Sequence, residues 1–208
     1  MLTRIILVRH GETEWNKAGA EKFRGREDIE LNEIGVRQAK AAAERITSWP
    51  VSAFYSSPLK RALTTAKILA MPFCLSVESL EGLVDIDYGN WQGLPYQEVS
   101  ERYKQLYNQW LQRPHEFTFP GGESLQDVRV RATAALEKVL GQHEEETIVL
   151  VSHQVVCKVL ICSLLGLDNS HFWQVEQDVC AINVFEARNG RLTVTAINDT
   201  CHLESLSV

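Results

Sequence analysis

The sequence feature that most constrains the fold is a short apolar run that ends in two polar, chargeable residues. Residues 5–8 are Ile, Ile, Leu and Val, and a β-branched run of this length predicts a buried strand. Residues 11–16 contain Gly, Thr and Asn and predict a turn. Arg9 and His10 therefore stand at the carboxyl end of the strand, where open α/β sheets bind their ligands.

The two residues at this strand end have a chemistry in common. The guanidinium of Arg9 offers a planar fork of donors that suits a phosphate group. The imidazole of His10 can be neutral and nucleophilic near pH 7, and Gly11 lets an anion approach the backbone closely. The pattern favours a phosphate site, and a strand end with two solvated polar residues stays the alternative.

Strand and helix patterns alternate along the rest of the chain, which predicts a three-layer α/β/α sandwich with a mostly parallel central sheet. Asn189-Gly190 predicts a hairpin between two late strands and hence an antiparallel strand at the C-terminal edge. Besides the first strand, we expect strands at 53–56, 75–80, 147–151, 179–186 and 192–197, and helices at 33–47, 58–70, 124–140 and 155–166, with a further helix opened by Pro95.

Length and charge narrow the class of protein. The 208 residues fit a single domain, 1–208, in which 81–122 form a partly helical lid over the site. A net charge of −6 argues against general binding to nucleic acid or membranes. No signal peptide or spanning segment is evident, so we expect a cytoplasmic protein. Cysteine and histidine spacing fits no metal site, so none is expected.

Three predicted strand ends carry polar residues of the same kind. The first carries Arg9 and His10, the strand at 53–56 leads to Arg61 one turn into the next helix, and the strand at 147–151 leads to His153. If these strands are parallel neighbours, two imidazoles and two guanidiniums meet at one sheet edge. Such a cluster is costly to bury without an anion. Arg61 as a solvated helix residue and His153 as a core histidine remain alternatives.

The run from Arg9 to Asn16 resembles the opening motif of the histidine phosphatase superfamily, in its phosphoglycerate-mutase-like branch. The resemblance continues, in the order of the family, through four further motifs at 56–62, 87–93, 120–124 and 151–153. It implies that His10 accepts the phosphoryl group, that Arg9, Arg61 and His153 hold its oxygens, and that Asn16 donates a further hydrogen bond.

The resemblance also supplies an acid for the leaving oxygen. The position where the family has Glu is Asp85 here, four residues before Gly89, and Asp is one methylene shorter. Asp87 is the competing candidate, with a role in stabilising the loop as its alternative. We prefer Asp85 on the alignment of the motif.

Other departures from the family pattern affect the pocket. Gln154 replaces a common Gly and keeps a backbone N–H toward phosphate, and Arg24 replaces a Gln and adds positive charge, unless it is a solvated loop residue. Tyr88 and His202 are candidate substrate contacts. We expect 200–203 to fold back toward the pocket rim, with a packed surface tail as the alternative.

The expected function is metal-independent hydrolysis of a small phosphorylated metabolite through a phosphohistidine, without a cofactor. One alternative is a cofactor-dependent phosphoglycerate mutase, but 94–146 is shorter and less basic than the corresponding segment of such mutases. A second alternative is a catalytically silent phosphate-binding module. The resemblance leaves the substrate open among those of α-ribazole, phosphoserine and broad-specificity phosphatases. The oligomeric state is open too, with a homodimer among the alternatives.

Overall fold

A mixed sheet organises the computed structural model, which describes residues 2–16, 21–188 and 191–206. Its strand order is β3-β2-β4-β1-β5-β6. The strands β1 to β4 run parallel, and β5 and β6 are antiparallel to their neighbours, which confirms the predicted α/β fold. The predicted hairpin residues, 189–190, lie outside the described part of the chain. The strands are β1 Leu2–Arg9, β2 Val51–Ser56, β3 Val77–Ser79, β4 Thr147–Ser152, β5 Ile182–Arg188 and β6 Arg191–Asp199.

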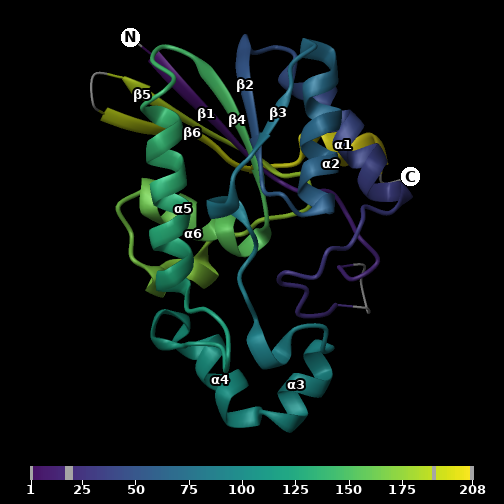
Figure 1. Ribbon diagram of the computed structural model, residues 1–208, viewed down its shortest axis with the longest axis vertical. Helices are drawn as coiled ribbons and strands as arrows, with labels where there is room; N and C mark the ends of the chain where they lie inside the picture. The colour runs from purple at the N-terminus through teal and green to yellow at the C-terminus, as the bar shows by residue number, and fades with distance from the viewer. Residues whose placement is uncertain (1, 17–20, 189–190, 207–208) are drawn as a thin grey trace.

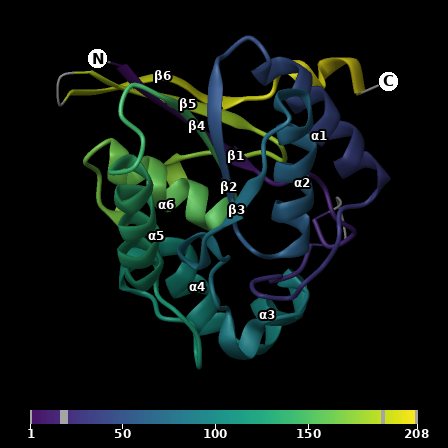
Figure 2. The same cartoon turned by 45° about the horizontal axis from the view of Figure 1, so that its top comes forward.

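Helices cover both faces of the sheet and make the fold three layers deep (Figures 1 and 2). Successive side chains of a strand point to opposite faces. Ile6 and Val8 of β1 accordingly pack with α1 and α2, whereas Ile5 and Leu7 pack with α5 and α6. The bounds are α1 Glu33–Ile46, α2 Lys60–Ala70, α5 Leu125–Leu140 and α6 Gln154–Leu164.

Local signals in the sequence set the starts of two of these helices. The Asn32 side chain accepts a hydrogen bond from the backbone N–H of Gly35 and caps α1. Ser124 and Asp127 form a reciprocal capping box at the start of α5, although Asp stands where Glu or Gln is usual. Both helices therefore begin where the polar residues predict.

Residues 81–94, which contain Asp85 and Asp87, are called the acid loop below. The segment that follows this loop lies beyond the carboxyl ends of the central strands (Figure 1). The helix expected after Pro95 is interrupted, because Tyr103 has φ −120° and ψ 38° and divides it into α3 Tyr96–Arg102 and α4 Lys104–Gln112. The Trp91 ring is fully buried against Tyr103, Tyr107 and Phe117. The role of 81–122 as a lid stays a prediction.

Two predicted strands are shorter than expected. The strand expected at 75–80 spans only Val77–Ser79, and the strand expected at 179–186 begins at Ile182. Cys180 lies inside the second of these stretches, and its positive φ of 52° is incompatible with an extended strand; Cys74, just before the first stretch, has φ 55°. Short 3-10 helices occupy other loops: η1 Met71–Phe73, η2 Glu81–Leu83, η3 Gly89–Trp91, η4 Pro114–Glu116, η5 Asn169–Gln174 and η6 Cys201–Leu206.

The C-terminal segment packs on the α1 side of the sheet. Its helix η6 contacts α1, and Leu203 lies against the core cluster of that face. The proposed contact of 200–203 with the substrate stays a prediction. In the described residues, no helix is both long enough and apolar enough to cross a membrane.

Candidate active site

The sheet register brings the three predicted strand ends together. β4 lies between β1 and β2, with Arg9 opposite Ser152. The backbone N–H of His10 donates to the carbonyl oxygen of Ser152 at 2.9 Å, and that of Ser57 donates to Val151 at 3.0 Å. The side chains that follow β1, β2 and β4 therefore gather at one edge, the one that faces α3 and α4 (Figure 1).

His10 is fully buried, and its ring has one committed nitrogen. Nδ1 lies 2.7 Å from the carbonyl oxygen of Gly11. Since a carbonyl only accepts, Nδ1 carries the proton and Nε2 keeps its lone pair. Nε2 has no hydrogen-bond partner among the described residues. Burial, then the charges of Arg61, Arg24 and Arg9, hold the pKa of His10 well below its usual value. The ring is thus neutral near neutral pH, and Nε2 keeps the lone pair that a nucleophile needs.

A second imidazole faces the first. His153 precedes α6, and its ring centroid lies 5.3 Å from that of His10. Its Nε2 lies 2.8 Å from the hydroxyl of Ser57, and its Nδ1 has no hydrogen-bond partner among the described residues. Burial is the main cause that lowers the pKa of His153 well below the usual value.

Three buried guanidiniums surround the histidines. Arg61 donates to the carbonyl oxygens of Glu27 and Gly25, at 2.7 Å each, and Arg9 donates to that of Gln177 at 2.5 Å. Burial lowers the pKa of Arg9 to about 10. Arg24, whose alternative was a solvated loop position, is only 7% exposed.

Each of the three arginines keeps free donor capacity. Among the described residues the Nε atoms of Arg9, Arg24 and Arg61 are buried without a partner. Within ion-pair distance of these guanidiniums, the described part of the chain supplies one carboxylate, that of Asp85. Buried charge must be compensated. Three guanidiniums beside one carboxylate leave an excess positive charge that a bound dianion would neutralise.

The acid loop places the two candidate carboxylates differently. Asp85 is 4% exposed, its Oδ2 lies 3.1 Å from Nη2 of Arg61, and the same oxygen lies 3.8 Å from Nδ1 of His153. The Asp87 carboxylate accepts from the backbone N–H of Gly89 and pairs with Arg26 at 3.6 Å. The structure thus brings Asp85 to the cluster and holds Asp87 within its own loop.

A family model of the histidine phosphatase superfamily (branch 1) matches residues 5–200 of this chain. The chain belongs to the histidine phosphatase superfamily. The resemblance seen in the five sequence motifs is confirmed, and the protein is a phosphatase of this family.

Individual relatives agree with the family. Phosphoserine phosphatase 1 of Hydrogenobacter thermophilus is 38% identical over 97% of this chain and 95% of its own length. The metal-independent phosphoserine phosphatase of Arabidopsis thaliana is 33% identical, over 99% of this chain and 85% of its length. The solved structure of YhfR from Bacillus stearothermophilus has a TM-score of 0.91 and 30% identity, and the match covers 97% of this chain and all of that one.

Asn16 and Gln154 flank the phosphatase site. Oδ1 of Asn16 accepts from the backbone N–H and the hydroxyl of Thr13, at 2.7 and 2.6 Å, so the other end of this side chain, the amide nitrogen, is a donor. Gln154 begins α6, and its side chain lies 3.5 Å from the carbonyl oxygen of Gln177. Gln154 thus contacts the carbonyl oxygen that Arg9 binds, and Asn16 lies in the turn that follows His10.

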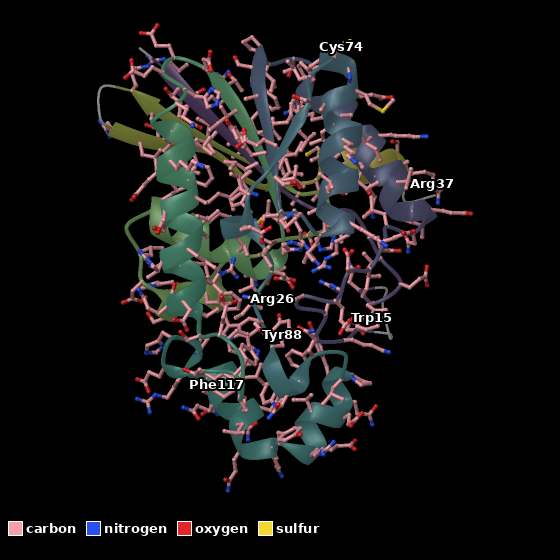
Figure 3. The ribbon with its side chains drawn as sticks, viewed as in Figure 1. Trp15, Arg26, Arg37, Cys74, Tyr88 and Phe117 are labelled. Carbon is pink, nitrogen blue, oxygen red and sulfur yellow. The ribbon has the colours of Figure 1, made fainter. Side chains whose placement is uncertain are left out.

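The candidate substrate contacts separate into two groups. Tyr88 is 8% exposed and packs edge-on against Phe23 and Phe119, between the sheet and the α3–α4 segment (Figure 3). It lines a cavity of about 160 Å³. His202 lies near Cys180 on the α1 side, and is not among the described residues that line this cavity.

Two residues, Arg131 and Glu123, hold the acid loop through contacts that the sequence does not predict. The Arg131 guanidinium donates to the carbonyl oxygens of Gly82, Val84 and Asp85, at 2.9, 2.5 and 3.2 Å. It also binds Glu123, whose carboxylate accepts from the backbone N–H of Asp87 at 2.9 Å. Glu123 lies in the motif at 120–124, but nothing in the sequence links Arg131 to the loop.

Lys158 is a further residue near the site that the sequence motifs do not indicate. It is 3% exposed and lines the same cavity as Tyr88 and Gln154. A lone charge in the apolar run 155–162 is the signal that could have found it. In the described residues, no group of three or more His, Cys, Asp or Glu side chains is placed to hold a metal ion.

Proposed function

We propose that this phosphatase hydrolyses O-phosphoserine, without a metal ion, through a phosphohistidine formed on His10. One observation carries the proposal: His10 is buried with its Nδ1 proton fixed on Gly11 and its Nε2 free among three guanidiniums. A nucleophile needs a free lone pair, and a phosphoryl acceptor needs nearby positive charge. Both needs are met at the same atom.

In the first step the phosphoryl oxygens bind Arg9, Arg61, His153 and Asn16. Nε2 of His10 attacks phosphorus, and the bond from phosphorus to the ester oxygen breaks. Asp85, acting in its protonated form, gives its proton to that oxygen, which leaves as the hydroxyl of serine. The arginines offset the charge on the phosphoryl oxygens, a task that other phosphatases give to metal ions.

In the second step the Asp85 carboxylate accepts a proton from a water molecule. The water oxygen bonds to phosphorus and the bond to Nε2 of His10 breaks. Inorganic phosphate leaves, and both side chains return to their starting states. The position of Asp85 beside His153 and Arg61 supports this role.

The choice of O-phosphoserine rests on the relatives, two of which carry phosphoserine phosphatase in their names. Assays of O-phosphoserine, 3-phosphoglycerate, α-ribazole phosphate and p-nitrophenyl phosphate, each with and without EDTA, test it. We expect the highest kcat/KM with O-phosphoserine and no effect of EDTA. Isomerisation of 3-phosphoglycerate without phosphate release would indicate a mutase, and phosphate binding without turnover would indicate a silent module.

A further inference from the structure

Lys158 is an unusual buried charge close to the phosphoryl site. It is the one charged residue of α6, and its side chain is buried where α6 packs on η5. Its Nζ lies 5.2 Å from the ring centroids of both Phe172 and Trp173. Cation–π contacts of this kind stabilise an ammonium but supply no negative charge to neutralise it.

The ammonium has no anionic partner in the described part of the chain. Among the described residues, no carboxylate oxygen lies within ion-pair distance of Nζ, and the nearest acidic groups that act on it, those of Glu176 and Asp178, do so from further away. Burial lowers the pKa of Lys158, and the charges of Glu176 and Asp178 oppose this shift only in part. A buried lysine without an ion pair is what we expect of a site where the ligand supplies the anionic group.

The cavity around Lys158 has the size and the lining for a small organic acid. Its volume of about 160 Å³ equals that of a handful of water molecules. Aromatic rings supply most of the wall, and Gln154 and Lys158 supply polar groups. Gln154 of this wall and the guanidinium of Arg9 both contact the carbonyl oxygen of Gln177, so the cavity lies beside the phosphoryl site. A single ammonium in an aromatic wall suits a monoanion.

Helix α6 links this cavity to the phosphoryl site. His153 precedes the helix, Gln154 begins it, and Lys158 follows Gln154 by four residues on the same face. At 1.5 Å of rise per residue, the backbone of Lys158 stands about 7.5 Å further along the axis than that of His153. The flexible four-carbon stem of lysine adjusts this spacing to a short ligand.

We propose that Lys158 binds the carboxylate of the substrate and thereby selects short phosphorylated carboxylic acids over other phosphomonoesters. The inference rests on the proposed function, because it assumes that the phosphoryl group lies at His10. It makes Lys158 a specificity residue and assigns the aromatic cavity to the organic part of the substrate.

The test compares two esters that differ in the carboxylate alone: O-phosphoserine and O-phosphoethanolamine. In the wild-type protein we expect kcat/KM to favour O-phosphoserine by about 10- to 100-fold, the range for one hydrogen bond to a charged group. Lys158→Met should remove most of this preference, chiefly through a higher KM for O-phosphoserine. Lys158→Arg, which keeps the charge, should restore part of it. Lys138→Met, at an exposed position of α5, is the matched control and should leave the preference unchanged.

Three results would overturn the inference. The first is a wild-type protein that hydrolyses both esters equally well. The second is a Lys158→Met variant that keeps the preference for O-phosphoserine. The third is equal loss of activity on both esters in Lys158→Met and also in Lys158→Arg. The wild-type comparison stands even if Lys158→Met does not fold. Failure of the proposed function looks different, because His10→Ala would then retain activity on both esters.

Discussion

The hydrogen bond from His10 Nδ1 to the carbonyl oxygen of Gly11 determines the chemistry of the site. It fixes the tautomer and leaves Nε2 with a free lone pair, in a ring on which the charges of Arg61, Arg24 and Arg9 act. Asp85 completes this set, because its carboxylate contacts both Arg61 and the His153 side of the cluster. The reactivity therefore depends on a few side chains whose positions the backbone sets.

The two carboxylates of the acid loop should respond differently to the same substitution. Asp85→Asn removes the proton donor and the base, so we expect kcat on O-phosphoserine to fall by about 10²- to 10⁴-fold. Asp87→Asn removes a loop contact and should change kcat far less. Steady-state kinetics of the two variants measure this. A greater loss in Asp87→Asn than in Asp85→Asn would assign the acid to Asp87.

The acid loop is the element whose position matters most for this chemistry. Arg131 of α5 holds three of its carbonyl oxygens, and Glu123 holds both Arg131 and the N–H of Asp87. Gly89, at φ +51°, comes so close to the 120–122 backbone that a Cβ would meet the Pro120 oxygen at 2.3 Å. These contacts fasten the loop to the 120–123 segment and to α5.

Loss of the Arg131 contacts should displace the acid without touching the nucleophile. We expect Arg131→Met to lower kcat by about 10-fold or more, with a smaller change in KM, because a small misplacement of a catalytic group is costly. Lys138→Met on the same helix is the control. The phosphoenzyme gives a second readout, since hydrolysis of the intermediate also needs Asp85. An unchanged kcat in a folded Arg131→Met protein would show that Arg131 does not position the acid.

Helix starts could be predicted from the sequence because neighbouring residues determine them, whereas several contacts of the site join residues that are far apart in the chain. Asn32 and Ser124 mark helix starts through bonds that span three residues. In contrast, Arg9 binds the Gln177 carbonyl 168 positions away, and Arg131 reaches the acid loop only because α5 packs on η2. The proximity of residues 9, 10, 61 and 153 could be predicted from the sequence by assuming that their strands are parallel neighbours. The surroundings of Lys158 could not, because the pattern of apolar residues in its helix does not show which segments pack on that helix.

At the scale of the whole molecule, the site adds a dependence of stability on pH. His10 and His153 have folded-state pKa values well below 6.5 because both are buried. The unfolded chain therefore binds more protons than the folded one once the pH falls below about 6.5, and stability is lost in that direction. The homodimer and the cytoplasmic location expected from the sequence stay predictions.

Urea unfolding between pH 8 and pH 5 measures this dependence. We expect the free energy of unfolding to be level above pH 7 and to fall below pH 6.5, by about 1.4 kcal/mol per pH unit for each histidine that stays neutral in the folded state. His10→Asn should make the slope shallower, because one of the two groups is gone. A free energy that stays level down to pH 5 would contradict the burial of neutral imidazoles.

The central claim is that His10 carries the phosphoryl group, and rapid quenching with labelled p-nitrophenyl phosphate tests it most directly. The p-nitrophenolate leaving group needs little help from an acid, so Asp85→Asn should still form the phosphoenzyme. The same variant should hydrolyse the phosphoenzyme slowly, because it lacks the base. We predict an acid-labile, alkali-stable phosphoryl group on the peptide that contains His10. His10→Ala should form none and should lose at least about 10³-fold in turnover. A phosphoryl group on another residue, or turnover by His10→Ala close to that of the wild type, would contradict the account.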